Sequence, residues 1–235
     1  MSSSFPKPFQ SQFSLRGETM TCYGSDFRGI IQYNFNSQGY RSDFDFELSE
    51  CDPLALCFGS SIATGHGLPF EQSFGSIVAK HYDLKLWNLG QGCFRSSNKA
   101  IQDQIEFLVQ TELNINVWLI QFTHINRYGN TMDSYLDHDQ DKNIKNFELI
   151  LRSISNSLMN KKWAWFLCDY SQAEFTDYVV NHPNKIAIDP EVSDHVSVKE
   201  HQHLAPTTHA LKMLSLHPGS GWHSQMAQSF IDKLQ

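Results

Sequence analysis

Long apolar runs, paired cysteines and an excess of positive charge are all missing from this chain of 235 residues. No uncharged apolar stretch is long enough for a transmembrane helix, and the first residues, MSSSFPKPFQSQFS, lack the apolar centre of a signal peptide. A formal net charge of −7 and a pI near 5.8 argue against general binding to nucleic acids or anionic membranes. We therefore expect neither a membrane nor a nucleic-acid partner.

Cysteine is scarce and irregularly spaced. The five cysteines are odd in number and form no C-x-x-C pair, a usage typical of reduced thiols, so the sequence predicts a cytoplasmic protein. Phosphate-binding motifs are also absent. The loop after residue 58 has neither G-x-G-x-x-G nor a P-loop lysine, which disfavours a nucleotide binder, and we expect no cofactor. The cysteines are Cys22, Cys51, Cys57, Cys93 and Cys168.

Apolar, strand-length runs alternate with amphipathic stretches from residue 53 onward. This pattern predicts an α/β protein: a three-layer α/β/α domain over residues 51–235, with helices on both faces of a mainly parallel sheet. At 40% hydrophobic residues the chain can build one sizeable core. We expect about five strands, at residues 53–58, 85–89, 115–122, 163–168 and 185–188.

Helices are predicted where apolar residues recur at three- or four-residue spacing. One helix is expected from residue 73, and three more are marked by apolar faces. The first face is Ala100, Ile101, Ile105 and Leu108; the second is Ile144, Phe147, Leu151, Ile154 and Leu158; the third is Trp222, Met226, Phe230 and Ile231.

The first fifty residues have a different character. Residues 1 to about 20 are rich in Ser, Gln and Pro, as in a loosely docked arm. Ile31, Tyr33 and Phe35 then alternate with polar residues, which indicates a half-exposed strand followed by a turn at residues 36–39. We interpret residues 1–50 as an arm and a small β extension of the main domain.

The most informative stretch is Asp52 to Gly67, DPLALCFGSSIATGHG. A buried strand that ends in Gly59-x-Ser61 and leads into a helix is a favourable setting for a nucleophile, because the serine projects from the carboxyl edge of the sheet. The motif is short, however, and an ordinary turn would look the same. Two further polar loops, 90–98 and 123–129, leave the same edge.

Three blocks in order carry a family resemblance: Gly59-x-Ser61, then the sequence Asn-Leu-Gly-Gln-Gly at residues 88–92, then His217-Pro218-Gly219. Together they resemble the SGNH (GDSL-type) serine hydrolases, which are flavodoxin-like esterases and deacylases. The segment FNSQGYR at residues 35–41 resembles a leader found in one bacterial branch of that family. The resemblance covers residues 30–235 and rests on the order and spacing of the blocks.

The resemblance implies a role for each block. Ser61 would be the nucleophile and His217 the general base, because a serine hydroxyl needs a neutral imidazole to accept its proton. The backbone N–H groups of Ser61 and Gly92 would contribute to the oxyanion hole, where glycine permits close approach. The third block departs from the family's Gly-x-Asn-Asp, and either Asn126 or His124 could supply the remaining donor.

Two other departures concern carboxylates. Position 60 is serine where the family has aspartate, and Leu214 stands three residues before His217, where the family has its acid. Asp189 or Asp194 could orient the histidine instead. A serine–histidine pair can also work without the carboxylate at some loss of rate.

Several residues remain as candidates for substrate binding or for other roles. Arg127 could meet a substrate carboxylate or phosphate, and Phe70, Phe94 and Trp222 could line an acyl pocket. We expect His223 to pack or cap the final helix. The cluster His195, His201, His203 and His209 lacks the fixed geometry of a metal site, and we expect a polar loop without a metal.

The sequence thus predicts a serine esterase or deacylase acting on a small-molecule or glycan ester with a short acyl group, acetyl being our favoured choice. An acyltransferase on the same scaffold remains open, because partitioning of an acyl-enzyme depends on acceptor binding. A non-catalytic binding protein also remains open, because Leu214 and the third block depart from the family.

Overall fold

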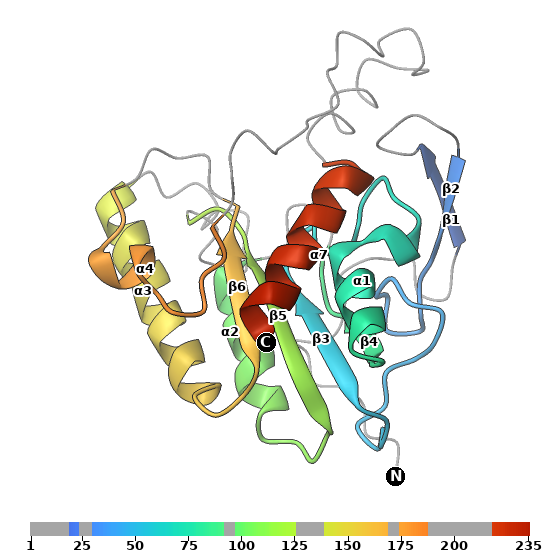
Figure 1. Ribbon diagram of the computed structural model, residues 1–235, viewed down its shortest axis with the longest axis horizontal. Helices are drawn as coiled ribbons and strands as arrows, with labels where there is room; N and C mark the ends of the chain where they lie inside the picture. The colour runs from blue at the N-terminus through green and yellow to red at the C-terminus, as the bar shows by residue number, and fades with distance from the viewer. Residues whose placement is uncertain (1–18, 24–29, 92–96, 126–138, 169–173, 188–217) are drawn as a thin grey trace, which may run out of the picture.

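The computed structural model describes residues 19–23, 30–91, 97–125, 139–168, 174–187 and 218–235, with side chains from residue 33 onward. A parallel sheet of four strands occupies the centre of this part of the chain (Figure 1). The strands are β3 (Leu54–Phe58), β4 (Lys85–Asn88), β5 (Ile115–Phe122) and β6 (Trp163–Leu167). Their order across the sheet is β4-β3-β5-β6. The predicted α/β architecture is therefore confirmed.

Helices cover both faces of the sheet. On one face α1 (Phe74–His81) and α7 (Ser220–Leu234) pack together, and on the other face lie α2 (Asn98–Leu108) and α3 (Gln140–Ser157). Strand β3 shows why the layers form: Leu54, Leu56 and Phe58 belong to the core beneath α2 and α3, while Ala55 and Cys57 belong to the core beneath α1 and α7. Every residue of this strand is buried. An uncharged run fits here because neither face of the sheet meets water.

The predicted fifth strand is reduced to a single parallel bridge between Lys185 and Trp165 in the described residues. It follows a one-turn helix, α4 (Asp177–Val180), and residue 188 lies outside the described part. The other predicted strands agree with β3 to β6, and the predicted helices agree with α1, α2, α3 and α7.

The N-terminal extension is a two-stranded antiparallel sheet of β1 (Thr19–Tyr23) and β2 (Ile30–Asn34). The predicted turn follows it: Gly39 has φ 82° and its N–H donates to the carbonyl of Asn36. The Asn36 side chain closes this turn, since its Oδ1 accepts from the N–H groups of Gln38 and Tyr40. The division at residue 50 stays a prediction.

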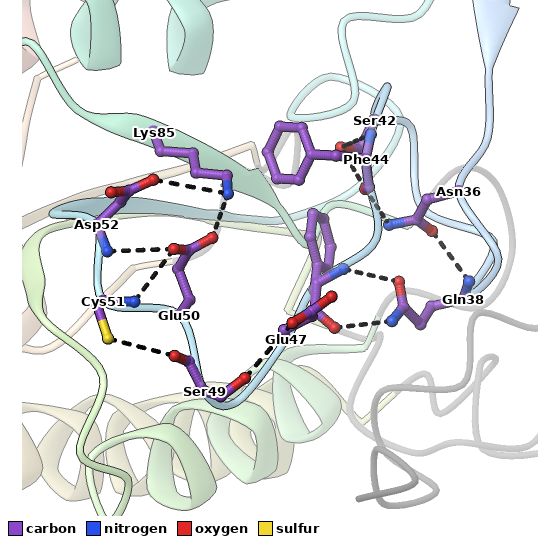
Figure 2. A network of polar contacts seen from close by, with 11 residues as sticks. Asn36, Gln38, Ser42, Phe44, Glu47, Ser49, Glu50, Cys51, Asp52 and Lys85 are labelled. Carbon is purple, nitrogen blue, oxygen red and sulfur yellow. Dashed lines mark hydrogen bonds and ion pairs between the residues drawn. The ribbon is translucent and has the colours of Figure 1, made fainter. Parts of the chain in front are cut away.

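Residues 33–52, called the upstream segment below, continue from this extension and run beside the sheet. Figure 2 shows its polar contacts. The Gln38 amide exchanges two hydrogen bonds with the backbone of Phe46, and Glu50 pairs with Lys85 at the start of β4. Phe46 also stacks on Trp87 of β4, with ring centroids 4.9 Å apart. The segment is therefore fixed to the edge of the sheet.

Among the described residues, the structure has no helix that is long and apolar enough to cross a membrane.

Candidate active site

The sheet has a topological switch point between β3 and β5. These strands are parallel neighbours, yet β3 leads to α1 on one face and β5 leads to α3 on the opposite face. In an open parallel sheet the connections diverge at such a point and leave a crevice beyond the carboxyl ends of the strands. The loop that carries Ser61 leaves β3 at this place (Figure 1).

The two serines after Gly59 have different environments. Ser60 is buried, and both its N–H (2.6 Å) and its Oγ (2.9 Å) donate to Oε1 of Gln121 in β5. Ser61 is only half-buried, so it is the more accessible of the pair. The neutral Ser60–Gln121 contact occupies the position where the resembled family has aspartate, and it ties the turn across the switch point.

Gly59 is required for this turn. Its φ is +150°, and a Cβ there would lie 2.4 Å from Gln121 Oε1 and 2.8 Å from the Ala63 Cβ. A larger residue would clash with both neighbours and would also adopt an unfavourable backbone conformation.

The turn after Ser61 is closed by its own hydrogen bonds. The Ser61 carbonyl accepts from Thr64 Oγ1 (2.7 Å) and from the His66 N–H (3.0 Å). The nearby thiol of Cys57 is no rival nucleophile, because it is fully buried and burial raises its pKa.

The second block lies beside the first. The buried Asn88 at the end of β4 donates from Nδ2 to the Ala63 carbonyl (2.9 Å) and accepts from the Gly90 N–H (3.0 Å). The Gln91 N–H then donates to the Gly59 carbonyl (2.8 Å). These bonds bring the two loops together up to residue 91. Gly92, the predicted oxyanion donor, lies outside the described residues, as does Phe94.

The third block is held by α2. The buried Asn98 accepts from the Thr123 N–H (2.8 Å) and donates from Nδ2 to the Thr123 carbonyl (3.2 Å). His124 follows, half-buried, at the same edge of the sheet. This position is compatible with a donor role for His124. Asn126 and Arg127 lie outside the described residues.

The predicted base, His217, lies outside the described residues, together with Asp189, Asp194, Leu214 and the loop histidines. The described residues resume at Pro218, and α7 begins at Ser220. Figure 1 shows α7 starting at the end of the sheet to which the strand arrows point. His217 is therefore three residues from a helix that begins on the same side as the Ser61 loop.

His223 is excluded as an alternative base. It is fully buried, and its Nδ1 accepts from the N–H of Phe74, the first residue of α1 (3.1 Å). Its ring also stacks on the Phe74 ring. It therefore caps α1 and joins α7 to that helix, which refines the packing role predicted for it.

Trp222 was expected to line an acyl pocket, and this expectation is wrong. The side chain is 5% exposed and packs edge-on against Phe166 of β6 in the core. An aromatic residue at the first turn of a helix can face either the rim or the sheet, and here it faces the sheet. Phe70 is half-buried in the short 3₁₀ helix η2 (Phe70–Gln72).

Three residues that organise the site were not singled out as such from the sequence: Asn88, Gln121 and Asn98. Each is a buried amide; Asn88 is the last residue of β4, and Gln121 is the residue before the last of β5. A polar side chain in such a position needs a hydrogen-bond partner, which is the signal that could have identified them. In the described residues no cluster of His, Cys, Asp or Glu could hold a metal ion.

Comparisons with known proteins gave structural likeness only. No family model and no curated protein matches the chain. Similar solved structures include a candidate lipolytic protein of the G-D-S-L family from Desulfitobacterium hafniense DCB-2 (TM-score 0.43, 10% identity, 75% of this chain and 99% of that one). Another is the salicylyl-acyltransferase SsfX3 of a tetracycline biosynthetic pathway (TM-score 0.42, 13% identity, 86% and 56%).

A third is a carbohydrate esterase family 2 enzyme with a carbohydrate-binding domain, from Corynascus thermopiles (Myceliophthora fergusii) (TM-score 0.40, 11% identity, 88% and 71%). The likeness to these proteins is one of structure alone. At this identity and TM-score the likeness carries no argument about the reaction, which has to be argued from the residues.

Proposed function

We propose that this protein is an SGNH-type serine esterase or deacylase that hydrolyses a short-chain acyl ester through an acyl-enzyme on Ser61. One observation carries the proposal: beyond the end of β3, at the switch point, Ser60 is buried against Gln121 while Ser61 stays accessible on a closed turn. A nucleophile needs both a fixed backbone and a free approach for the substrate.

In the proposed reaction His217 accepts the Ser61 proton while Oγ attacks the acyl carbonyl. The N–H groups of Ser61 and Gly92, with His124 or Asn126, stabilise the oxyanion. Collapse of the intermediate breaks the ester bond, and His217 returns the proton to the leaving alcohol. Water then attacks the acyl-enzyme in the same way, with His217 as the base, and the carboxylic acid leaves Ser61. Asp189 or Asp194 would orient the His217 ring.

Substrate binding is proposed on the same side of the sheet, with Arg127 and Phe94 as candidate contacts for a small-molecule or glycan ester. The similar structures include both esterases and an acyltransferase, so they do not choose between water and an alcohol as acceptor.

The test is hydrolysis of p-nitrophenyl acetate and butyrate by the wild type, Ser61→Ala and His217→Ala, over roughly pH 6 to 9. We expect both variants to lose turnover while circular dichroism shows intact folding. Equal rates in all three proteins would contradict the proposed esterase activity.

A fluorophosphonate label then separates the remaining alternatives. Labelling of Ser61 without turnover in water would favour an acyltransferase, to be followed by product analysis with alcohol acceptors. Absence of both labelling and turnover would favour a binding protein.

A further inference from the structure

Arg41 of the upstream segment contacts the loop that carries Ser61. The residue is 3% exposed, and its Nη1 donates to the carbonyls of Thr64 (2.9 Å) and Gly65 (2.7 Å). Its Nη2 donates to the Leu68 carbonyl (2.6 Å). One buried guanidinium therefore holds three backbone carbonyls within a stretch of five residues. Charge-assisted hydrogen bonds of this kind are stronger than neutral ones.

These carbonyls belong to the turn that fixes the Ser61 backbone. Thr64 also donates its hydroxyl to the Ser61 carbonyl, and the His66 N–H donates to the same oxygen. A shift of residues 64–66 would thus be transmitted directly to Ser61. Because buried carbonyls need donors, loss of the guanidinium would favour opening of the loop toward water.

Tyr33 also contacts Arg41 and the loop of residues 64–68. Its ring lies 3.9 Å from the Arg41 guanidinium carbon, and its hydroxyl accepts from the Gly67 N–H. The ring face offsets the burial of the positive charge, as in other cation–π pairs. The loop from residue 64 to residue 68 is held at four backbone groups by these two side chains.

The neighbouring Tyr40 reaches the second block. Its hydroxyl accepts from Nε2 of Gln91 (3.4 Å) and of Gln104 (3.2 Å), and the Gln91 N–H binds the Gly59 carbonyl. Tyr40 is fully buried, and burial raises its pKa, so the hydroxyl stays protonated. The upstream segment thus contacts both loops that the proposed reaction uses.

We propose that Arg41 is a positioning residue for Ser61: its guanidinium fixes the 64–68 carbonyls and thereby the geometry of the nucleophile. The inference rests on the proposed function for its effect on turnover, but not for its effect on the loop. The upstream segment is then a working part of the site, although it precedes the sheet in the chain.

The first test is kinetic and compares Arg41→Lys with Arg152→Ala. Lysine keeps the charge but lacks the fork that binds several carbonyls. Misplacement of the nucleophile lowers kcat more than it weakens substrate binding, so we expect kcat for p-nitrophenyl acetate to fall about tenfold or more with KM within about twofold. Arg152 lies exposed on α3, where it pairs with Glu148, and its variant should match the wild type. Unchanged kcat in Arg41→Lys overturns the inference.

The second test measures how readily the loop itself opens. Hydrogen–deuterium exchange of peptides covering residues 60–68 should become faster in Arg41→Lys, while α3 peptides keep wild-type exchange. Tyr33→Phe, which removes the acceptor of Gly67 and keeps the ring, should show a smaller change in the same direction. If the wild type has no turnover, the proposed function fails and exchange alone decides: equal exchange at residues 60–68 in all variants overturns the role of Arg41.

Discussion

Ser155 contacts a histidine ring, whereas Ser61 is assigned its histidine only by resemblance; yet Ser61 is the better nucleophile candidate. Ser155 lies in the last turn of α3, with its Oγ 3.0 Å from His182 Nε2. The Nδ1 of His182 accepts from the indole N–H of Trp165 (3.0 Å), so its proton must be on Nε2. Nε2 therefore donates to Ser155, which in turn donates to the Leu151 carbonyl (2.6 Å).

A serine–histidine contact is therefore not a catalytic pair by itself. His182 cannot accept the Ser155 proton while Trp165 holds its other nitrogen, and burial, followed by the charges of Lys233 and Lys185, lowers its pKa to about 4. Ser155 also lies near the amino edge of the sheet, because α3 runs antiparallel to the strands. Ser61 instead lies beyond the carboxyl edge of the sheet and is accessible, as the binding of a substrate requires.

The largest expected effect separates the two serines by activity. Ser61→Ala should lower ester turnover by about 10⁴-fold or more, whereas Ser155→Ala should keep the wild-type rate. Ser155→Ala should instead lose about 1–2 kcal/mol of unfolding free energy, because the Nε2–H of His182 and the hydroxyl of Tyr178 lose their acceptor. Parallel assays and urea denaturation check this. Loss of turnover in Ser155→Ala would contradict the comparison.

The next effect concerns the turn of Ser61. Gly59→Ala should cost about 3 kcal/mol, from the clash with Gln121 and Ala63 and from the positive φ. Gly221→Ala is the matched control, because a Cβ there meets nothing within 4 Å and the residue is helical. That variant should be as stable as the wild type or more so. Similar melting temperatures for the two variants would show that the turn tolerates a side chain.

A smaller effect is expected from the Ser60 contact. Gln121→Met keeps the volume but removes the acceptor of two buried hydrogen bonds, and should cost about 2 kcal/mol. Gln228→Met, on the exposed face of α7, removes only a bond to Asp232 and should cost almost nothing. Denaturant midpoints of the two variants provide the measurement, and equal midpoints would mean that Gln121 does not hold the turn.

The smallest effect is the pH response of the Ser155 region. Because the pKa of His182 falls from 6.5 to about 4 on folding, the unfolded chain binds a proton more readily than the folded protein. The contribution of neutral His182 to the free energy of unfolding is complete above about pH 6.5 and is lost as the pH falls toward about 4. His182→Gln should therefore flatten the stability profile between roughly pH 6.5 and 5, above the carboxylate range. An unchanged slope in His182→Gln would contradict this assignment.

The sequence predicted the four strands and the covering helices well, because uncharged runs and amphipathic faces report burial directly. It predicted less of the site, because hydrogen bonds between distant residues leave no local pattern. Ser60 and Gln121 are 61 positions apart, and Arg41 is 23 to 27 positions from the carbonyls that it holds. The fifth strand was overestimated, since the described residues pair with β6 through a single bridge, made by two backbone hydrogen bonds of Trp165 with Asn184 and Ile186.

The upstream segment has one more consequence, for association between molecules. Strand β4 is at the border of the described sheet, where Phe46 stacks on Trp87 and Glu50 pairs with Lys85. Uncovered border strands offer unpaired backbone groups to other chains, and proteins protect them with covering segments and charges. We therefore expect a chain shortened to begin at residue 53 to self-associate more than the full chain, because Trp87 and Lys85 of β4 would lose these contacts.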